Sequence, residues 1–373
     1  MNHTAGLQRA LPFRSPLLAS VFLIVLGALP ALAFDHTAFA KHVLENHIVP
    51  GYARFDAKAA ALAVRAHALC KAPSKKALDA ARAAEREALR AWGQVEHLRF
   101  GPITKDKRLD GLLFYPDTRG IARRQIDQLL RKHDAEDLDP EELASASVAV
   151  QGFTGLDRTL FGKGSDKLAE PARTPTFRCR YVAALADGIA DTASKTLAAW
   201  SGPYQDTWLK PGADNGTFLT PEETTQVLLR AYVTELEAIR IQRLEPVLAD
   251  AKKGVRMHPL FPDSGQGVAF IVANIEGVRN LLTEGGFADP AFVEIEKEEQ
   301  AAGILDSVVT DLGFALRAGN NAMDVAPDVF ASPPARAKLA PLTYSLKNAE
   351  ETGRSALGVL TGQALGFNSL DGD

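Results

Sequence analysis

Apolar residues recur at intervals of three and four along almost the whole chain, and runs of alternating β-branched residues are nearly absent. The first spacing places side chains on one face of an α-helix, whereas strict alternation is the pattern of a half-buried strand. The segment 221–245 is typical, with an apolar stripe at spacings of four, three and three: Leu229, Val233, Leu236 and Ile239. Such a stripe suits a helix in a bundle. The sequence therefore predicts an all-α fold.

Two helix starts are marked by their local sequence. Asp139 and Thr220 are capping residues, each followed by a proline at the first helical position and by glutamates in the first turn. The spacing of apolar residues predicts that the first helix continues to Phe161 and the second to Glu245.

Two stretches interrupt the helical pattern. Residues 162–176 are rich in Gly, Pro and small polar residues, which predicts a boundary between an N-terminal bundle at 34–165 and a C-terminal bundle at 172–365. Residues 201–220 form a long predicted loop with Tyr204 and Trp208. Loops of this length are often functional, but the two aromatic residues could equally cover a core.

The first 33 residues have the pattern of a secretory signal peptide. Arg9 and Arg14 precede an apolar run that ends in Ala31-Leu32-Ala33, which predicts cleavage before Phe34. No cysteine lies near the junction, and no later run approaches the ~20 apolar residues of a membrane span. We expect an exported mature chain without a membrane helix.

The net charge and the cysteine content exclude some classes of partner and of metal site. The formal net charge of −4 becomes −6 once the signal segment leaves with its two arginines, which argues against a nucleic-acid partner. Cys70 and Cys179 could form a disulfide in an oxidising compartment, or could both be buried and unpaired. Two cysteines without a CxxC motif do not form a thiolate zinc site.

Polar residues interrupt the apolar stripes at three places. Thr154 and Asp157 continue the stripe expected between 140 and 161, and a carboxylate buried there needs a partner. In the two other stretches an acid and an arginine lie one helical turn apart, as Glu96 with Arg99 and as Glu276 with Arg279. Each of these two pairs could also be a local ion pair with no further role.

The histidines give no clear metal motif. The spacings of His36, His42 and His47 do not place three imidazoles on one helix face, and His97 is expected at the surface. The sequence has no HExxH, GxSxG, P-loop or dinucleotide-binding motif.

Four segments together resemble a known family. They are IVPGYARFDAKAAALAVRAHAL, AWGQVEHLRFGPI, LLFYPDTRGIARRQIDQLL and QGFTGLDRTLFG, which begin at residues 48, 91, 112 and 151. Their order and spacing are similar to landmarks of the imelysin-like proteins, the M75 peptidase family, over about residues 37 to 360. The resemblance implies two helical bundles packed together, export to the periplasm of the bacterial cell envelope, and a link to iron uptake.

The family's Gly-x-His-x-x-Glu motif, proposed as a metal site, maps onto Gly152, Thr154 and Asp157. The glycine matches, but threonine replaces histidine and aspartate replaces glutamate. Threonine is a poor neutral metal ligand, and aspartate is one methylene shorter than glutamate. A metallopeptidase usually needs three protein ligands, an open coordination position and a general base, so we expect no catalysis here.

These observations predict a non-catalytic periplasmic binding or accessory protein of the imelysin-like type. Its ligand would be iron or a ferric chelate, with Asp157 and Glu96 as metal ligands, arginines holding anionic groups, and Arg99 balancing Asp157. Its partners would be envelope proteins of iron uptake. The predicted ligand-binding residues are Glu96, Arg99, Gly152, Thr154, Asp157, Ser264, Glu276 and Arg279. The alternatives are a secreted M75-type metallopeptidase and a structural envelope protein that docks a protein partner.

Overall fold

The computed structural model describes residues 34–134, 136–249, 259–287, 289, 292 and 297–363. The signal peptide predicted at residues 1–33 lies outside the described residues. Within these ranges every regular element is helical, so the all-α prediction is confirmed. None of the helices in the described part is long and apolar enough to cross a membrane.

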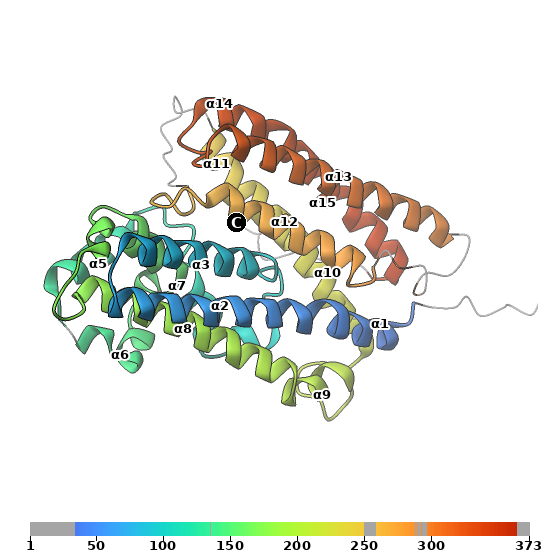
Figure 1. Ribbon diagram of the computed structural model, residues 1–373. Helices are drawn as coiled ribbons and strands as arrows, with labels where there is room; N and C mark the ends of the chain where they lie inside the picture. The colour runs from blue at the N-terminus through green and yellow to red at the C-terminus, as the bar shows by residue number, and fades with distance from the viewer. Residues whose placement is uncertain are drawn as a thin grey trace, which may run out of the picture. The chain divides into compact units, whose positions relative to one another are not determined.

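The helices fall into two packed groups (Figure 1). The first group contains α1 His36–Val43, α2 Val49–Lys71, α3 Lys75–Gly93, α4 Arg108–Leu112, α5 Ile121–Lys132, α6 Pro140–Ser145, α7 Gly152–Leu156, α8 Phe177–Trp200 and α9 Pro203–Leu209. The second contains α10 Pro221–Glu237, α11 Glu245–Leu248, α12 Gly267–Thr283, α13 Lys297–Val325, α14 Pro333–Arg336 and α15 Ala340–Thr361. Three π-helical segments interrupt them: η1 Leu44–Ile48, η5 Asp157–Phe161 and η7 Ala238–Leu244.

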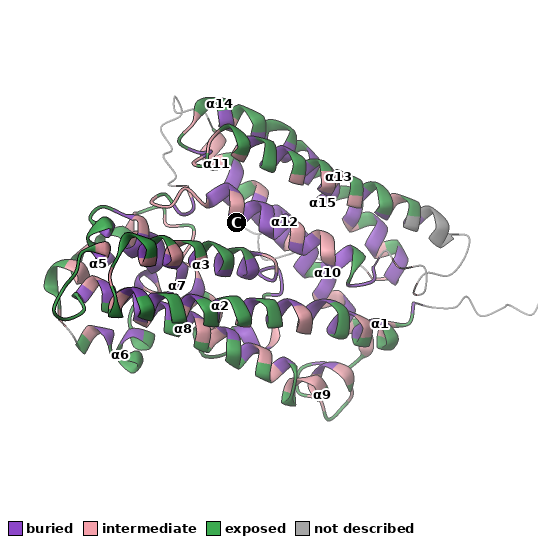
Figure 2. Ribbon diagram, viewed as in Figure 1, coloured by how far each residue is buried: buried purple, intermediate pink, exposed green. Residues whose placement is uncertain are grey.

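The core lies where these helices meet. In the first group α2 packs between α3 and α8, and in the second α13 packs on α15 and α12. Helix α12 also packs against α3 and α10, and it is buried along almost its whole length, as Figure 2 shows. Its sequence is apolar nearly all round, the composition of a helix enclosed by others. Helix α12 therefore joins the two groups.

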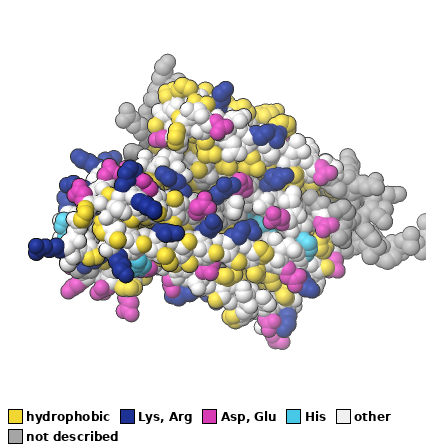
Figure 3. Space-filling view, viewed as in Figure 1, with side chains coloured by type: hydrophobic (Ala, Val, Ile, Leu, Met, Phe, Trp, Pro, Cys, Tyr) yellow, Lys and Arg dark blue, Asp and Glu magenta, His cyan; other side chains and the backbone are white. Residues whose placement is uncertain are grey.

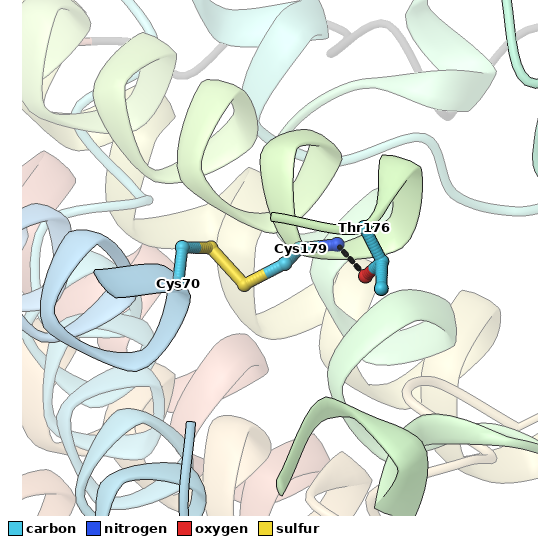
Figure 4. Close-up of a disulfide and its surroundings, with 3 residues drawn as sticks. All are labelled: Cys70, Thr176 and Cys179. Carbon is cyan, nitrogen blue, oxygen red and sulfur yellow. Dashed lines mark hydrogen bonds between the residues drawn. A yellow bond between two sulfur atoms is a disulfide. The ribbon is translucent and has the colours of Figure 1, made fainter. Parts of the chain in front are cut away.

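A disulfide links two long helices of the first group. Cys70 in the last turn of α2 bonds to Cys179 in the first turn of α8, with 5.5 Å between the Cα atoms (Figure 4). Thr176 caps α8 by accepting a hydrogen bond from the Cys179 amide. Thus α8, which follows the predicted boundary at 162–176, is tied to α2. The division of the chain at that boundary stays a prediction.

The helix predicted from 140 to 161 is not continuous, so that prediction is wrong. Helix α6 ends at Ser145, and the backbone is extended at Ala146 and again at Gln151 before α7 begins. Between them the Ser147 hydroxyl accepts from the Ala149 amide and starts a short 3-10 turn. A polar side chain that bonds its own backbone competes with the helix in this way. Apolar spacing alone did not reveal the break.

Two further expectations concern segment ends. The helix predicted from 221 continues through η7 into α11, so its extent past Ile239 is confirmed. The stretch with Glu96 and Arg99, in contrast, is not part of a helix, because α3 ends at Gly93 and residues 94–97 form turns. The segment 201–220 is not a loop throughout, because Pro203–Leu209 form α9. Trp208 in α9 is fully buried and its indole donates to the Ala40 carbonyl, so this aromatic residue covers the core.

Candidate functional site

The glycine and threonine of the degenerate motif hold one neighbouring segment. Gly152 has φ of +56°, and a Cβ there would lie 2.3 Å from the Gly111 carbonyl oxygen and 2.4 Å from that of Leu112. Only glycine permits this conformation and this approach without strain. Two residues later, the Thr154 hydroxyl accepts a hydrogen bond of 3.0 Å from the Phe114 amide. The segment 111–114 is therefore fixed against α7.

The carboxylate of Asp157 holds a second segment. Asp157 opens η5, is 4% exposed, and accepts from the amides of Asp263 at 3.1 Å and Ser264 at 2.9 Å. Burial raises the pKa of Asp157 to about 6, against the lowering effect of the hydrogen bonds from residues 263 and 264. The prediction that Arg99 balances Asp157 is wrong, because these amides are its partners and Arg99 bonds Glu96.

Arg158, the next residue in η5, joins a third element. Its guanidinium bonds Asp127 of α5 at 2.8 Å and Asp263 at 3.1 Å. The side chain of Arg158 is 13% exposed, so both ion pairs are partly shielded from water. Asp157 and Arg158 together anchor the segment 259–263 to η5 and α5.

These anchored segments enclose a cavity of about 290 Å³ beside Asp157. Its walls come from the segment 113–117, α5, η5 and the segment 259–263. Apolar and aromatic side chains form most of the surface, including Phe114, Tyr115 and Phe261. The polar side chains that line it are Asp117, Arg123, Thr154, Asp157, Arg158 and Asp263.

A second polar centre, the Arg243 cluster, consists of Arg243, Glu96, Glu235 and Asn274. Arg243 in η7 donates at 2.8 Å to Glu96, at 2.8 Å to Glu235 and at 2.7 Å to the Asn274 side-chain oxygen. Asn274 of α12 donates in turn to the other oxygen of Glu96. All four residues are at most 4% exposed. Half-exposed Arg99 adds a bond of 3.2 Å to Glu96.

Electrostatics in the Arg243 cluster favour a charged arginine. Burial opposes that charge, but the carboxylates of Glu96 and Glu235 raise the pKa of Arg243 above its ordinary value. Burial also raises the pKa of Glu235, and the guanidinium only partly offsets this effect. The cluster lies where α12 comes close to the turn after α3. The approach is so close that a Cβ at Gly277 would be 2.3 Å from the Gln94 carbonyl oxygen.

Tyr115 connects the cavity with the Arg243 cluster. Its ring lines the cavity, and its hydroxyl donates at 3.0 Å to the carbonyl of Gln242, the neighbour of Arg243 in η7. Burial raises the pKa of Tyr115 to about 12, although the charge of Arg243 acts in the opposite direction. The two centres are adjacent but are built from separate hydrogen-bond networks.

The predicted site residues therefore fall into three places. Thr154 and Asp157 line the cavity, Gly152 and Ser264 lie next to it in the segments that α7 and Asp157 hold, and Glu96 and Arg99 belong to the Arg243 cluster. Glu276 faces α3, where it bonds Arg90 at 2.8 Å and Gln94 at 2.9 Å. Figure 3 shows Lys and Arg side chains gathered over α3. The Nε of Arg279 is buried and has no hydrogen-bond partner among the described residues.

The local ion-pair interpretation holds for one of the two pairs. Glu96 and Arg99 do bond across one turn, but Glu276 pairs with Arg90 of another helix instead of Arg279. The metal assignment of Glu96 and Asp157 gains no support from these contacts, because each carboxylate already accepts from other groups. The described residues contain no group of three or more His, Cys, Asp or Glu placed to hold one metal ion.

Several important residues were missed in the sequence, although a signal existed for some. Arg243 follows Leu236 and Ile239 at helical spacing, and Asn274 lies beside Ile271 and Val278 on the buried side of α12. Glu85 sits on the apolar stripe of α3 and is fully buried, with neither carboxyl oxygen hydrogen bonded in the described part. Burial, and secondly the charge of Asp157, raise the pKa of Glu85 to about 8.

His97 is buried, so its predicted surface position is wrong. Its Nε2 lies 2.8 Å from Nε2 of His47 in η1, and both imidazoles are 1% exposed. One ring must donate and the other accept, which requires at least one neutral histidine. Burial lowers the pKa of His47 to about 3, with the charge of Arg54 adding to the effect, and lowers the pKa of His97 well below its ordinary value.

Acid should therefore weaken the fold through this pair. The unfolded chain binds protons at these histidines below about pH 6.5, whereas folded His47 stays neutral to about pH 3. The contribution of the two neutral histidines to the free energy of unfolding is complete above about pH 6.5. It is lost as the pH falls from there towards about 3, by up to ~1.4 kcal/mol per pH unit for each histidine.

The measurement compares the unfolding free energy of the wild type and of His47→Gln/His97→Gln between pH 7 and 5. Taking the difference cancels the opposite effect of Glu85 and Asp157, whose raised pKa values favour the fold in acid. His67→Gln, at an exposed histidine paired with Asp187, is the matched control. A difference independent of pH would contradict the assignment of two neutral buried imidazoles.

Comparison with known proteins finds a matching family and similar solved structures. The imelysin family model matches residues 48–339. The crystal structure of an imelysin-like protein from Psychrobacter arcticum 273-4 is similar, with a TM-score of 0.71, 22% identity and coverage of 90% of this chain and 100% of the other. A protein from Parabacteroides distasonis ATCC 8503, provisionally named iron-regulated protein A precursor, has a TM-score of 0.66, 15% identity and coverage of 87% and 96%. No curated protein matches. With the family model covering most of its length, the chain belongs to the imelysin family.

Proposed function

We propose that the mature chain is a non-catalytic binding or accessory protein of the bacterial periplasm that acts in iron uptake. Its ligand is held in the cavity beside Asp157. The Cys70–Cys179 disulfide supports an oxidising compartment, in agreement with the predicted signal peptide. The proposed role in iron uptake rests on the family resemblance and on the name of the Parabacteroides distasonis protein.

The observation that carries this proposal is the use of the motif residues. Gly152, Thr154 and Asp157 occupy the positions of the family motif, and each of them fixes a segment of the cavity wall by a close approach or a backbone hydrogen bond. A hydroxyl and a carboxylate so engaged build a shaped pocket rather than an open coordination site with a general base. Pockets that are apolar with few polar groups are typical of small-molecule binding.

The predicted contacts outside the cavity have other roles in this proposal. Glu96 and Arg99 stabilise the region behind Tyr115 through the Arg243 cluster, and Glu276 fastens α12 to α3. Arg279 stays a predicted ligand contact, as does the participation of Glu96 and Asp157 in holding a metal. Envelope proteins of iron uptake stay the predicted partners.

The test is a thermal melting screen of the mature protein against ferric citrate, ferric chloride and haem. A ligand present at 100 times its dissociation constant should add ~2.7 kcal/mol to the stability of the folded state. We expect a shift with a ferric chelate and its loss in Asp157→Asn, because the loop amides use different oxygens of Asp157 and the NH2 group of asparagine would face one of these N–H donors. Asp166→Asn, at a highly exposed acid, is the control.

Two results would point elsewhere. Chelator-sensitive cleavage of casein that disappears in Asp157→Ala would support the metallopeptidase alternative. A large fall in the melting temperature of Asp157→Asn with the ligand shift intact would show that Asp157 is only a scaffold residue, and would move the ligand away from this cavity.

A further inference from the structure

The walls of the cavity beside Asp157 suit a flat apolar group. Phe114 and Tyr115 come from one anchored segment, and Phe261 comes from the other. Leu260 and Ile126 add aliphatic surface. Aromatic side chains prefer to stack on, or meet edge-on, another ring, so three of them around one space favour a planar ring over a bare ion.

The backbone at Phe261 is strained in this wall. Its φ is +50°, a conformation that bulky residues rarely adopt because it is sterically unfavourable for them. The ring is held nonetheless, because it is 3% exposed and packs edge-to-face on Phe270 with 5.3 Å between centroids. Strain of this kind persists where the surroundings fix the residue, and it concentrates at ligand-binding walls.

The carboxylates that line the cavity are already matched. Asp117 accepts from the amides of Ile121 and Ala122 at 2.8 and 2.9 Å, at the N-terminus of α5. That helix end carries partial positive charge, which favours the carboxylate further. Asp157 accepts from the amides of residues 263 and 264, and Asp263 pairs with Arg158.

The polar groups at the cavity that lack a partner among the described residues are hydrogen-bond donors. The guanidinium of Arg123 has no hydrogen bond or ion pair to any described residue, and it lies on the exposed side of α5 where it lines the cavity. The Thr154 hydroxyl accepts from Phe114 but has its own hydrogen free among the described contacts. A ligand that completes these groups must offer acceptor oxygens, and a carboxylate binds a guanidinium best.

We infer that this cavity binds an aromatic carboxylate, with the ring against Phe114, Tyr115 and Phe261 and the carboxylate on Arg123. The inference rests on the proposed function and names the class of its ligand: an organic anion that is recognised with or without iron. The three matched acids make the cavity formally more negative than positive, so the sign of the ligand charge is the point to test.

Three benzene derivatives of similar size decide the sign of the ligand charge: anionic benzoate, neutral benzamide and cationic benzylamine. Binding to the mature protein is measured by calorimetry and by thermal melting. We expect benzoate to bind at least 10-fold more tightly than benzamide and benzylamine not to bind. Arg123→Gln should weaken benzoate at least 10-fold, whereas Arg131→Gln, an exposed arginine on the same helix that does not line the cavity, should leave it unchanged.

Other outcomes separate this inference from the proposed function. The inference is overturned if benzylamine binds more tightly than benzoate, or if Arg123→Gln leaves the affinity for benzoate unchanged. If ferric citrate or ferric chloride shifts the melting temperature through Asp157 while benzoate does not bind, the inference fails and the function in iron uptake stands. If benzoate binds through Arg123 but the ferric probes cause no shift and do not compete, the ligand class stands and the iron function fails.

Discussion

Replacing Arg243 with alanine is expected to lower the free energy of unfolding by ~3 to 5 kcal/mol, which would unfold many domains of ordinary stability. The reason is the burial of its partners. Glu96 and Glu235 are each 1% exposed, and both accept a hydrogen bond of 2.8 Å from the guanidinium. Without Arg243 these carboxylates lose their shared counter-charge in the protein interior.

Urea unfolding of the variant measures this loss, and two further variants test its cause. Arg99→Ala removes the half-exposed partner of Glu96 and should cost ~1 kcal/mol or less, because water screens that pair. The triple variant Glu96→Gln/Glu235→Gln/Arg243→Met removes all three charges and should recover most of the stability. If the triple variant is no more stable than Arg243→Ala, packing rather than charge explains the effect.

The local sequence predicted that these segments are helical, but it did not predict every position at which a helix ends. Pro140 and Pro221 stand at the first positions of α6 and α10, as expected from the capping residues before them. The break after Ser145 was missed because it depends on Ser147 bonding its own backbone, while the apolar spacing continues across it. The three π-helical segments leave no signal in a pattern read at the helical period.

The sequence predicted the burial of Asp157 but not its partners. Burial was expected from the apolar stripe, and Asp157 is indeed buried, with Thr154 beside it in the wall of the same cavity. Its actual partners are backbone amides more than 100 residues away in sequence, at Asp263 and Ser264. Every residue except proline has such an amide N–H, so no pattern of side chains could have identified these two donors.

The same limit applies to the Arg243 cluster. Glu96 was singled out because it interrupts an apolar stripe one helical turn from Arg99, but α3 ends at Gly93 and Glu96 reaches the interior from a turn. Its main partner, Arg243, lies 147 residues further along the chain. Matching one buried acid to one of many arginines requires knowing that η7 packs against the turn after α3, which no short motif in a single sequence encodes.

Loss of the disulfide is expected to be the other large effect. Cys70 and Cys179 lie 109 residues apart, and closing a loop of about 100 residues stabilises the folded state by ~4.7 kcal/mol when the unfolded chain is fully flexible. The bond joins the end of α2 to the start of α8, two helices that also pack against each other (Figure 1), so the native arrangement should persist without it. We therefore expect Cys70→Ala/Cys179→Ala to fold, but with a free energy of unfolding lower by ~3 to 5 kcal/mol.

Urea unfolding of the double variant and of the wild type, each with and without a reducing agent, measures the contribution of the disulfide. Reduction should lower the stability of the wild type by nearly the same amount and leave the variant unchanged, since the described residues contain no free cysteine. Alanine is the suitable replacement because Cys179 is 3% exposed and a serine hydroxyl would be buried there. A loss below ~1 kcal/mol would mean that the unfolded chain already keeps α2 and α8 close, which removes the entropic advantage of the bond.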